Sequence, residues 1–155
     1  MTAIPQSVSD FLAQRRFAVA GVSREPGQAA NAVYRKLRDA GYEVFPVNPQ
    51  ASEVEGVRCY AGLDSVPGPL DGVVVATHPG VSIELVRQCA ALGVPRVWLH
   101  RSFGEGSVSA EAVRECEARG IRCIVGGCPL MYCHPIDPGH RCMRWLLRWR
   151  GRLPG

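Results

Sequence analysis

The sequence predicts an α/β fold with a doubly wound, mainly parallel sheet and helices on both of its faces. Two patterns indicate this class. Short runs of almost continuous Val, Ile, Ala and Phe recur along the chain, and segments with a helical spacing of apolar residues separate them. Strands without polar alternation are typical of parallel sheets that helices cover on both sides, as in Rossmann-like folds.

The expected elements follow one another in a regular order. A helix over residues 7–14 precedes a strand over 17–21. Further strands are expected over residues 42–47, 70–76, 96–99 and 121–125, with a short strand or turn at 57–59. The remaining helices are expected over residues 28–40, 81–92, 109–118 and 138–150.

Glycines and prolines mark the ends of these elements. Gly41, Gly93 and Gly120 each follow a helical pattern, where glycine commonly ends a helix. Pro46 and Pro49 close the second strand. Because no repeat, linker or low-complexity tract interrupts this order, residues 1–155 are expected to form a single domain.

The composition is that of an ordinary globular protein, with 46% hydrophobic residues, 21% charged residues and a net charge of +4. No apolar run approaches the roughly 20 residues that span a bilayer, and the first residues lack the pattern of a signal peptide. We therefore expect a cytoplasmic protein.

The end of the chain predicts a basic amphipathic helix. Trp145, Leu147 and Trp149 alternate with arginines in a segment from about residue 138 to 150. Some helices of this kind bind membranes, but more often the apolar side packs on its own domain or on a second subunit, which we favour here. Neither a membrane nor a nucleic acid is an expected partner, whereas a homodimer stays open.

Three loops fall where strands end, at the edge where doubly wound sheets bind ligands. In the first loop, Gly21, Val22, Ser23 and Arg24 follow a buried strand. Backbone amides near a helix start bind phosphate, and Ser23 can add a hydroxyl group and Arg24 a positive charge. Because the loop matches neither G-x-G-x-x-G nor the Walker A motif, an ordinary strand-to-helix turn is the alternative.

The second loop, Val47, Asn48 and Pro49, argues against a nicotinamide dinucleotide. Rossmann dehydrogenases carry Asp or Glu near the end of the second strand, where it accepts hydrogen bonds from the ribose. No carboxylate occurs here before Glu53. Asn48 can hydrogen-bond a base or a ribose without charge, or it can serve only as a turn residue between two prolines.

The third loop, Thr77, His78 and Pro79, precedes a helix. Its amides could bind a phosphate or an amide-containing ligand, while a lone histidine is more often a surface or capping residue than a catalyst. His100, at the end of the fourth strand, could act as an acid or base, but it has no evident partner. Because no nucleophile elbow or recognisable carboxylate pair occurs, no catalytic residue is assigned.

Seven cysteines raise the alternative of a metal- or redox-responsive module. The soft metal ligands near the end of the chain are Cys128, Cys133, His134, His140 and Cys142. Their spacing fits no standard zinc motif, and an odd cysteine count without a secretion signal argues against a disulfide framework. We expect no metal site and keep this module as an alternative.

Four segments together resemble a known family: FAVAGVSR at 17–24, GYEVFPVNP at 41–49, DGVVV at 71–75 and VWL at 97–99. They resemble the small bacterial and archaeal CoA-binding proteins, which are similar to the N-terminal domain of the succinyl-CoA synthetase alpha subunit. The resemblance covers about residues 10–130. It implies a Rossmann-like sheet that binds coenzyme A or an acyl-CoA.

The resemblance also implies where the ligand lies. Residues 21–24 would cradle phosphate, residues 47–49 would flank the adenosine, and residues 77–79 would lie along the rest of the CoA. The family commonly has Gln where His100 stands, and a Lys that is common shortly after the Cys128-Pro129 pair is missing. Because no catalytic residue is assigned, we expect a non-catalytic binding protein or a subunit of a larger acyl-CoA enzyme, with an NAD(P)-dependent oxidoreductase as the alternative.

Overall fold

Within residues 3–102 and 104–155, which the computed structural model describes, five strands form the central sheet. Their order is β2 (Glu43–Val47), β1 (Arg16–Ala20), β5 (Gly72–Val75), β6 (Arg96–Leu99) and β7 (Arg122–Val125). All neighbouring pairs are parallel. The strand order reverses beside β1, because β2 lies on one side of it and the later strands on the other. The predicted doubly wound α/β class is confirmed.

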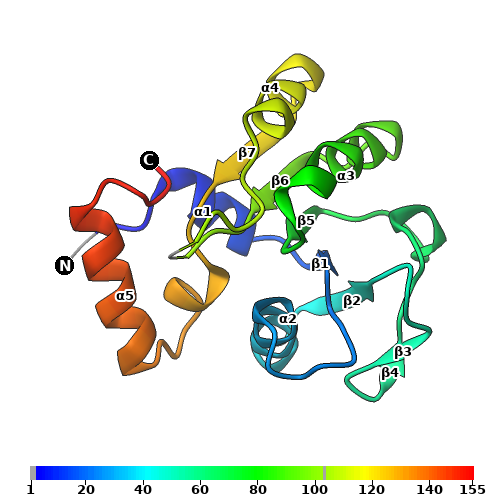
Figure 1. Cartoon of the computed structure of the whole chain (residues 1–155), viewed down its shortest axis with the longest axis horizontal. Helices are drawn as coiled ribbons and strands as arrows, with labels where there is room; N and C mark the ends of the chain where they lie inside the picture. The colour runs from blue at the N-terminus through cyan, green and yellow to red at the C-terminus, as the bar shows by residue number, and fades with distance from the viewer. Residues whose placement is uncertain (1–2, 103) are drawn as a thin grey trace.

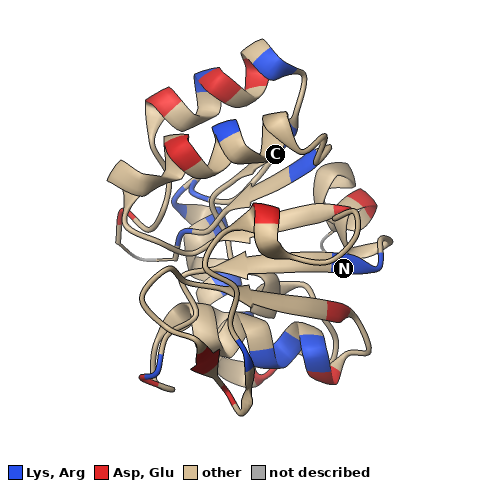
Figure 2. Cartoon of the chain, turned by 90° about the vertical axis from the view of Figure 1, so that its right-hand side faces the viewer, with Lys and Arg blue, Asp and Glu red and all other residues tan. Residues whose placement is uncertain are grey.

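Helices cover both faces of the sheet (Figure 1). On one face lie α1 (Gln6–Leu12), α2 (Ala29–Asp39) and α5 (Pro138–Trp149), and on the other lie α3 (Pro79–Ala91) and α4 (Ala110–Arg119). Figure 2 shows α3 and α4 together at the top of the view, where they carry both acidic and basic residues. Successive strand side chains therefore enter two different cores, as the two-residue period of a strand requires.

The larger core lies under α1, α2 and α5 and is built on aromatic contacts. Phe11 of α1 stacks on Phe17 of β1 with ring centroids 4.6 Å apart, and it meets Trp98 edge-on at 5.4 Å. Trp98 Nε1 donates to the carbonyl oxygen of Gly126 at 2.9 Å, so its one polar atom is satisfied inside the core. These contacts fix β6 and also β1, whose carboxyl end leads into the first loop.

The short strand or turn expected at 57–59 is the second half of a hairpin. β3 (Glu53–Val54) pairs antiparallel with β4 (Val57–Arg58). Both turn residues have positive φ, 52° at Glu55 and 73° at Gly56, as a two-residue type I′ hairpin requires. The Tyr60 N–H then donates to the Pro46 carbonyl at 2.9 Å, which holds the hairpin beside the end of β2.

Element boundaries lie within two residues of the expected ones, and β6 has the expected bounds. α3, for example, begins at Pro79 because His78 caps it: His78 Nδ1 accepts from the Gly80 N–H at 3.1 Å. Pro79 lies in the first turn, where its missing N–H costs nothing. Two short 3₁₀ helices, Leu63–Ser65 and Pro129–Met131, complete the elements. No helix in the described part of the chain is long and apolar enough to cross a membrane.

Candidate functional site

Two adjoining cavities open where β1, β2 and β5 end. The first has a volume of about 400 Å³ and is called the polar cavity here; its lining residues are Gly21, Ser23, Arg24, Glu25, Gln28, Asn48, Gln50 and Ala51. The second, the apolar cavity, has about 330 Å³ and is lined by Ala20, Gly21, Val47, Asn48, Pro49, Ala61, Gly62, Thr77, Val81, Glu84, Leu85 and Gln88. Both volumes lie in the range of small-molecule sites. Because Gly21 and Asn48 line both cavities, the two adjoin.

Gly21 is the point at which the strand ends converge. Its φ is +105°, and a Cβ atom there would lie 2.3 Å from the carbonyl oxygen of Ala76, at the end of β5. Its N–H donates to the Val47 carbonyl of β2 at 2.9 Å. Only glycine combines this φ with this close backbone approach. The residue type at position 21 therefore determines how near the first loop comes to the other two.

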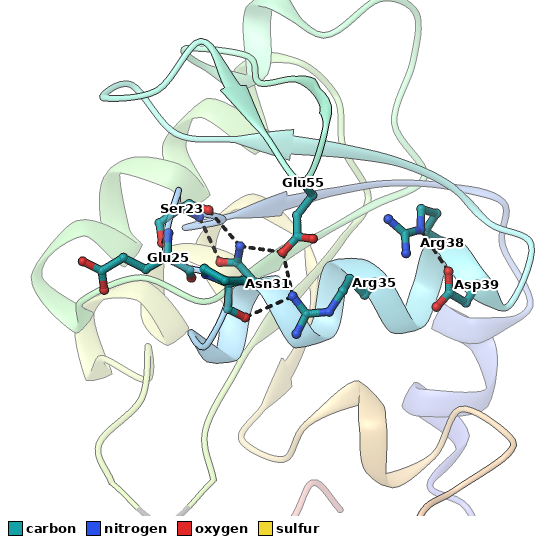
Figure 3. A network of polar contacts seen from close by, with 8 residues as sticks. Ser23, Glu25, Asn31, Arg35, Arg38, Asp39 and Glu55 are labelled. Carbon is teal, nitrogen blue, oxygen red and sulfur yellow. Dashed lines mark hydrogen bonds and ion pairs between the residues drawn. The ribbon is translucent and has the colours of Figure 1, made fainter.

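Asn31, near the start of α2, holds the loop that follows β1 (Figure 3). Its Oδ1 accepts from the Ser23 N–H at 3.0 Å, and its Nδ2 donates to the Ser23 carbonyl at 2.8 Å. The residue is 1% exposed, so both bonds form in a region where an unmade bond is costly. Ser23 Oγ accepts from the Glu25 N–H at 3.1 Å, which adds a local turn. The loop thus has a defined shape without a ligand.

Glu55, at the tip of the β3–β4 hairpin, completes this network (Figure 3). Its Oε1 accepts from Asn31 Nδ2 at 2.8 Å and from Arg35 at 2.6 Å, and its side chain is 12% exposed. Arg35 also donates to the Pro26 carbonyl at 3.0 Å. Arg35 therefore supplies the positive charge that a largely buried carboxylate needs. The hairpin, α2 and the first loop are joined through these side chains.

Asn48 ties the first loop to the second. Its Nδ2 donates to the Val22 carbonyl at 3.0 Å, and its Oδ1 accepts from the Gln50 N–H at 2.9 Å. The side chain therefore serves as a turn residue, one of the two roles that the sequence allows for it. It also lines both cavities, with a second amide hydrogen that a ligand could accept.

The third loop contributes less of its length to the cavities than expected. Thr77 lines the apolar cavity, and its carbonyl accepts from Ser107 Oγ at 2.7 Å. His78 and Pro79 line neither cavity. They form the capped start of α3, so their side chains position that helix, and the face of α3 with Val81, Leu85 and Gln88 takes their place in the wall.

The polar cavity has two features that suit an anion. Gln28, the residue before α2, lines the cavity and makes no side-chain capping bond, and the first amides of any helix have no acceptor within that helix. Arg24 adds an exposed guanidinium group. The end of β2 contributes Asn48 and Gln50 rather than a carboxylate, so the acidic ribose-binding residue of a dinucleotide enzyme does not stand among the described residues there.

His100 is held away from both cavities. It is 7% exposed, and no described protein group hydrogen-bonds its Nε2 atom. Burial, together with the nearby His140, lowers its pKa to about 4. The imidazole is therefore neutral near pH 7, and no acidic group among the described residues pairs with it for acid–base chemistry.

The cysteine-rich segment does not assemble a metal centre in the described part of the chain. No group of three or more His, Cys, Asp or Glu side chains is placed there to hold a metal ion. Cys128 and Cys133 are buried, and burial raises the pKa of Cys133 and raises that of Cys128 to about 12. Cys142 lies apart on the exposed side of α5, and His140 is paired with Asp137 at 2.6 Å. The two buried thiols lack the thiolate character of redox-sensing cysteines.

The predicted site residues thus divide into two groups. Those that line a cavity are Gly21, Ser23, Arg24, Val47, Asn48, Pro49 and Thr77. Val22, His78 and Pro79 do not; Val22 follows the end of β1 and is fully buried in the larger core, because the positive φ of Gly21 breaks the alternation of the strand. Sequence reasoning missed Asn31 and Glu55, which are 24 positions apart and meet only in the fold. It also missed Ala61 and Gly62, which the hairpin returns to the end of β2.

Comparison with known proteins identifies the family. The profile of the family described as "CoA binding domain" matches residues 15–134. This chain belongs to that family. The chain is 33% identical over 118 residues to the uncharacterized protein YneT of Bacillus subtilis, an alignment that covers 74% of this chain and 82% of YneT. The resemblance seen in the sequence is therefore confirmed.

Two further relatives differ in length: one is matched over nearly its whole chain and the other over only part of it. A solved structure of a hypothetical protein from Pyrococcus horikoshii superposes with a TM-score of 0.74 at 26% identity, over 83% of this chain and 93% of that one. The alpha subunit of an ADP-forming acetate–CoA ligase II from Pyrococcus furiosus is 29% identical over 68% of this chain. The match spans only 23% of that subunit, so the shared part is a fraction of a larger protein.

Substituting Gly21 tests the convergence of the strand ends. We expect Gly21→Ala to lower the free energy of unfolding by about 2 kcal/mol or more, because a Cβ would combine positive-φ strain with a backbone clash. Gly27→Ala is the matched control: it lies in the same loop, a Cβ there would meet no atom within 4 Å, and it should change stability by less than about 1 kcal/mol. Urea denaturation measures both, and equal stabilities would contradict the close approach at Gly21.

The buried His100 predicts a pH dependence of stability. Its pKa is about 4 in the folded protein against an ordinary value of 6.5, so the unfolded chain takes up a proton first as the pH falls. The contribution of His100 to the free energy of unfolding should therefore fall by roughly 3 kcal/mol between about pH 6.5 and pH 4, and this group should cause no further loss below that window. His100→Gln, neutral and similar in size, should lose this part of the slope in urea denaturation at a series of pH values. An unchanged slope would show that the imidazole is not held neutral by burial.

Proposed function

We propose that this chain binds coenzyme A or an acyl-CoA in the cleft formed by the polar and apolar cavities. The observation that carries the proposal is the joining of the two cavities at Gly21 and Asn48, at the carboxyl ends of β1, β2 and β5. CoA has a phosphorylated nucleotide at one end and a long, largely uncharged pantetheine arm at the other. A cleft with one polar and one apolar half suits such a ligand.

The residues suggest how the ligand is held. Its phosphates occupy the polar cavity, near Ser23, Arg24 and the uncapped start of α2. Its adenosine is flanked by the segment from Val47 to Pro49, and the pantetheine arm passes Thr77. Asn31 and Glu55 act as positioning residues because they hold the first loop without lining either cavity.

A binding role is favoured over catalysis by the residues that line the cleft. Among the described residues, its ionisable side chains are Arg24, Glu25 and Glu84, and no histidine or cysteine stands beside them. These groups do not form the nucleophile and base that acyl transfer requires. We propose that the chain binds its ligand in the cytoplasm, alone, as a homodimer or beside a larger acyl-CoA enzyme, as the relationship to the ligase subunit suggests.

Calorimetric titration of the purified chain with CoA, acetyl-CoA and NAD tests this proposal. We expect CoA to bind with a micromolar dissociation constant and NAD to give no heat of binding. Arg24→Gln should weaken CoA binding about tenfold, because it removes one charge-assisted bond to phosphate. Arg38→Gln is the matched control. Arg38 lies on α2, pairs with Asp39 at 2.9 Å and does not line the polar cavity, so this variant should bind CoA as the wild type does.

Two results would contradict the proposal. Binding of NAD in place of CoA would favour a nicotinamide-dependent enzyme. Binding of CoA that is equally strong in wild type and Arg24→Gln would show that the polar cavity does not hold the phosphates.

A further inference from the structure

The outer side of α5 is a surface that the proposed CoA site does not use. The helix lies at the edge of the molecule, on the other side of the sheet from α3 and α4 (Figure 1). Trp145 is 69% exposed and Trp149 is 77% exposed, whereas Trp98, the third tryptophan, is fully buried. The helix packs on its own domain through Leu147, as expected, but this packing leaves both indole rings uncovered.

The same segment carries charge of one sign. From Pro138 to the last residue there are five arginines and neither Asp nor Glu. Arg141 and Arg148 are exposed. Residues four apart share one side of a helix, so Arg141, Trp145 and Trp149 form a stripe, with Arg148 next to it. We call these four residues the Trp–Arg face.

We propose that the Trp–Arg face binds the surface of an anionic lipid bilayer, with α5 lying parallel to the membrane plane. The two indole rings, one helical turn apart on the same side, can reach the headgroup region together. The guanidinium groups beside them bind lipid phosphates, since each arginine near an anionic surface adds to the attraction. α5 lies at one edge of the molecule (Figure 1), and the exposure of Trp145 and Trp149 leaves their side of the helix open to a flat surface.

Other occupants fit this face less well. Two copies joined through α5 would bring their arginines together, and the segment offers no acidic residue to pair with them. Single-stranded nucleic acids stack their bases along a basic groove, whereas this face is the outer side of a helix. The family profile also ends at residue 134, before α5 begins, so binding of CoA does not account for two exposed tryptophans.

Vesicle flotation of the full chain tests the proposal. The probe is vesicles of phosphatidylglycerol and phosphatidylcholine in equal parts, with vesicles of phosphatidylcholine alone as the comparison. We expect the protein to float only with the anionic vesicles, and less so at high salt. Tryptophan emission should shift to shorter wavelength on binding, and the shift must come from Trp145 and Trp149 because Trp98 is already buried.

Two double variants and one control make the test specific. Trp145→Ala with Trp149→Ala should abolish the emission shift and weaken flotation. Arg141→Gln with Arg148→Gln should weaken binding about 25-fold, from about fivefold for each arginine. Arg87→Gln with Arg114→Gln removes the same charge from α3 and α4 on the opposite layer and should leave binding unchanged. All of these variants should keep the CoA affinity of the wild type, so this result is independent of the proposed function.

Several outcomes would overturn the proposal. Failure of the folded wild type to float with anionic vesicles would do so directly. If the control variant loses as much vesicle binding as the arginine variant, net charge alone would explain the binding, and the Trp–Arg face would not be the binding surface. If the protein does not bind vesicles but binds a single-stranded oligonucleotide, the Trp–Arg face would be assigned to nucleic acid. If it does not bind vesicles but forms a dimer that only the tryptophan variant dissociates, the face would be assigned to a second copy of the chain.

Discussion

The candidate site depends on one buried side chain amide. Asn31 pairs with both the N–H and the carbonyl of Ser23, in the way that a neighbouring strand would. The loop after β1 has no strand partner at this point, so its backbone groups would otherwise need water or a ligand. Glu55 and Arg35 then hold the Asn31 amide in place. The polar cavity exists in its present shape because this chain of bonds is complete.

The second constraint is the close packing of three strand ends around Gly21. The glycine lets the first loop touch the end of β5, and Asn48 binds the same loop from the side of β2. A site made in this way is largely formed before a ligand arrives, which lowers the entropic cost of binding. The parallel sheet makes the arrangement possible, because it places the carboxyl ends of all its strands at one edge.

The sequence indicates the sheet well because a parallel strand that is buried on both faces has a local signature. The run from Val73 to Val75 is an example, and the strand was expected within two residues of its observed bounds. Motif residues were harder to assign one by one. Val22 lies inside the phosphate-loop motif, yet its side chain is buried in the larger core, because the strand ends at Ala20 and the positive φ of Gly21 redirects the chain.

The features that sequence reasoning missed are contacts between distant segments. Asn31 and Glu55 meet only after a hairpin with strands of two residues has folded back over α2, and so short a strand leaves little pattern to detect. The cavity wall formed by α3 is another case. Its residues have the pattern of an ordinary helix, and only the start of that helix at Pro79 brings Val81 and Leu85 to the cleft.

Hydrogen exchange of the chain with and without CoA, in the wild type and in Asn31→Ala, tests the central claim most directly. We predict that CoA slows exchange in residues 21–28, 48–51 and 77–81 of the wild type. In Asn31→Ala, exchange in residues 21–28 should be faster without ligand, and the protection by CoA should be reduced. The account of a site held by Asn31 would be contradicted if CoA does not slow exchange in these loops. It would also be contradicted if CoA slows exchange equally in the wild type and in Asn31→Ala.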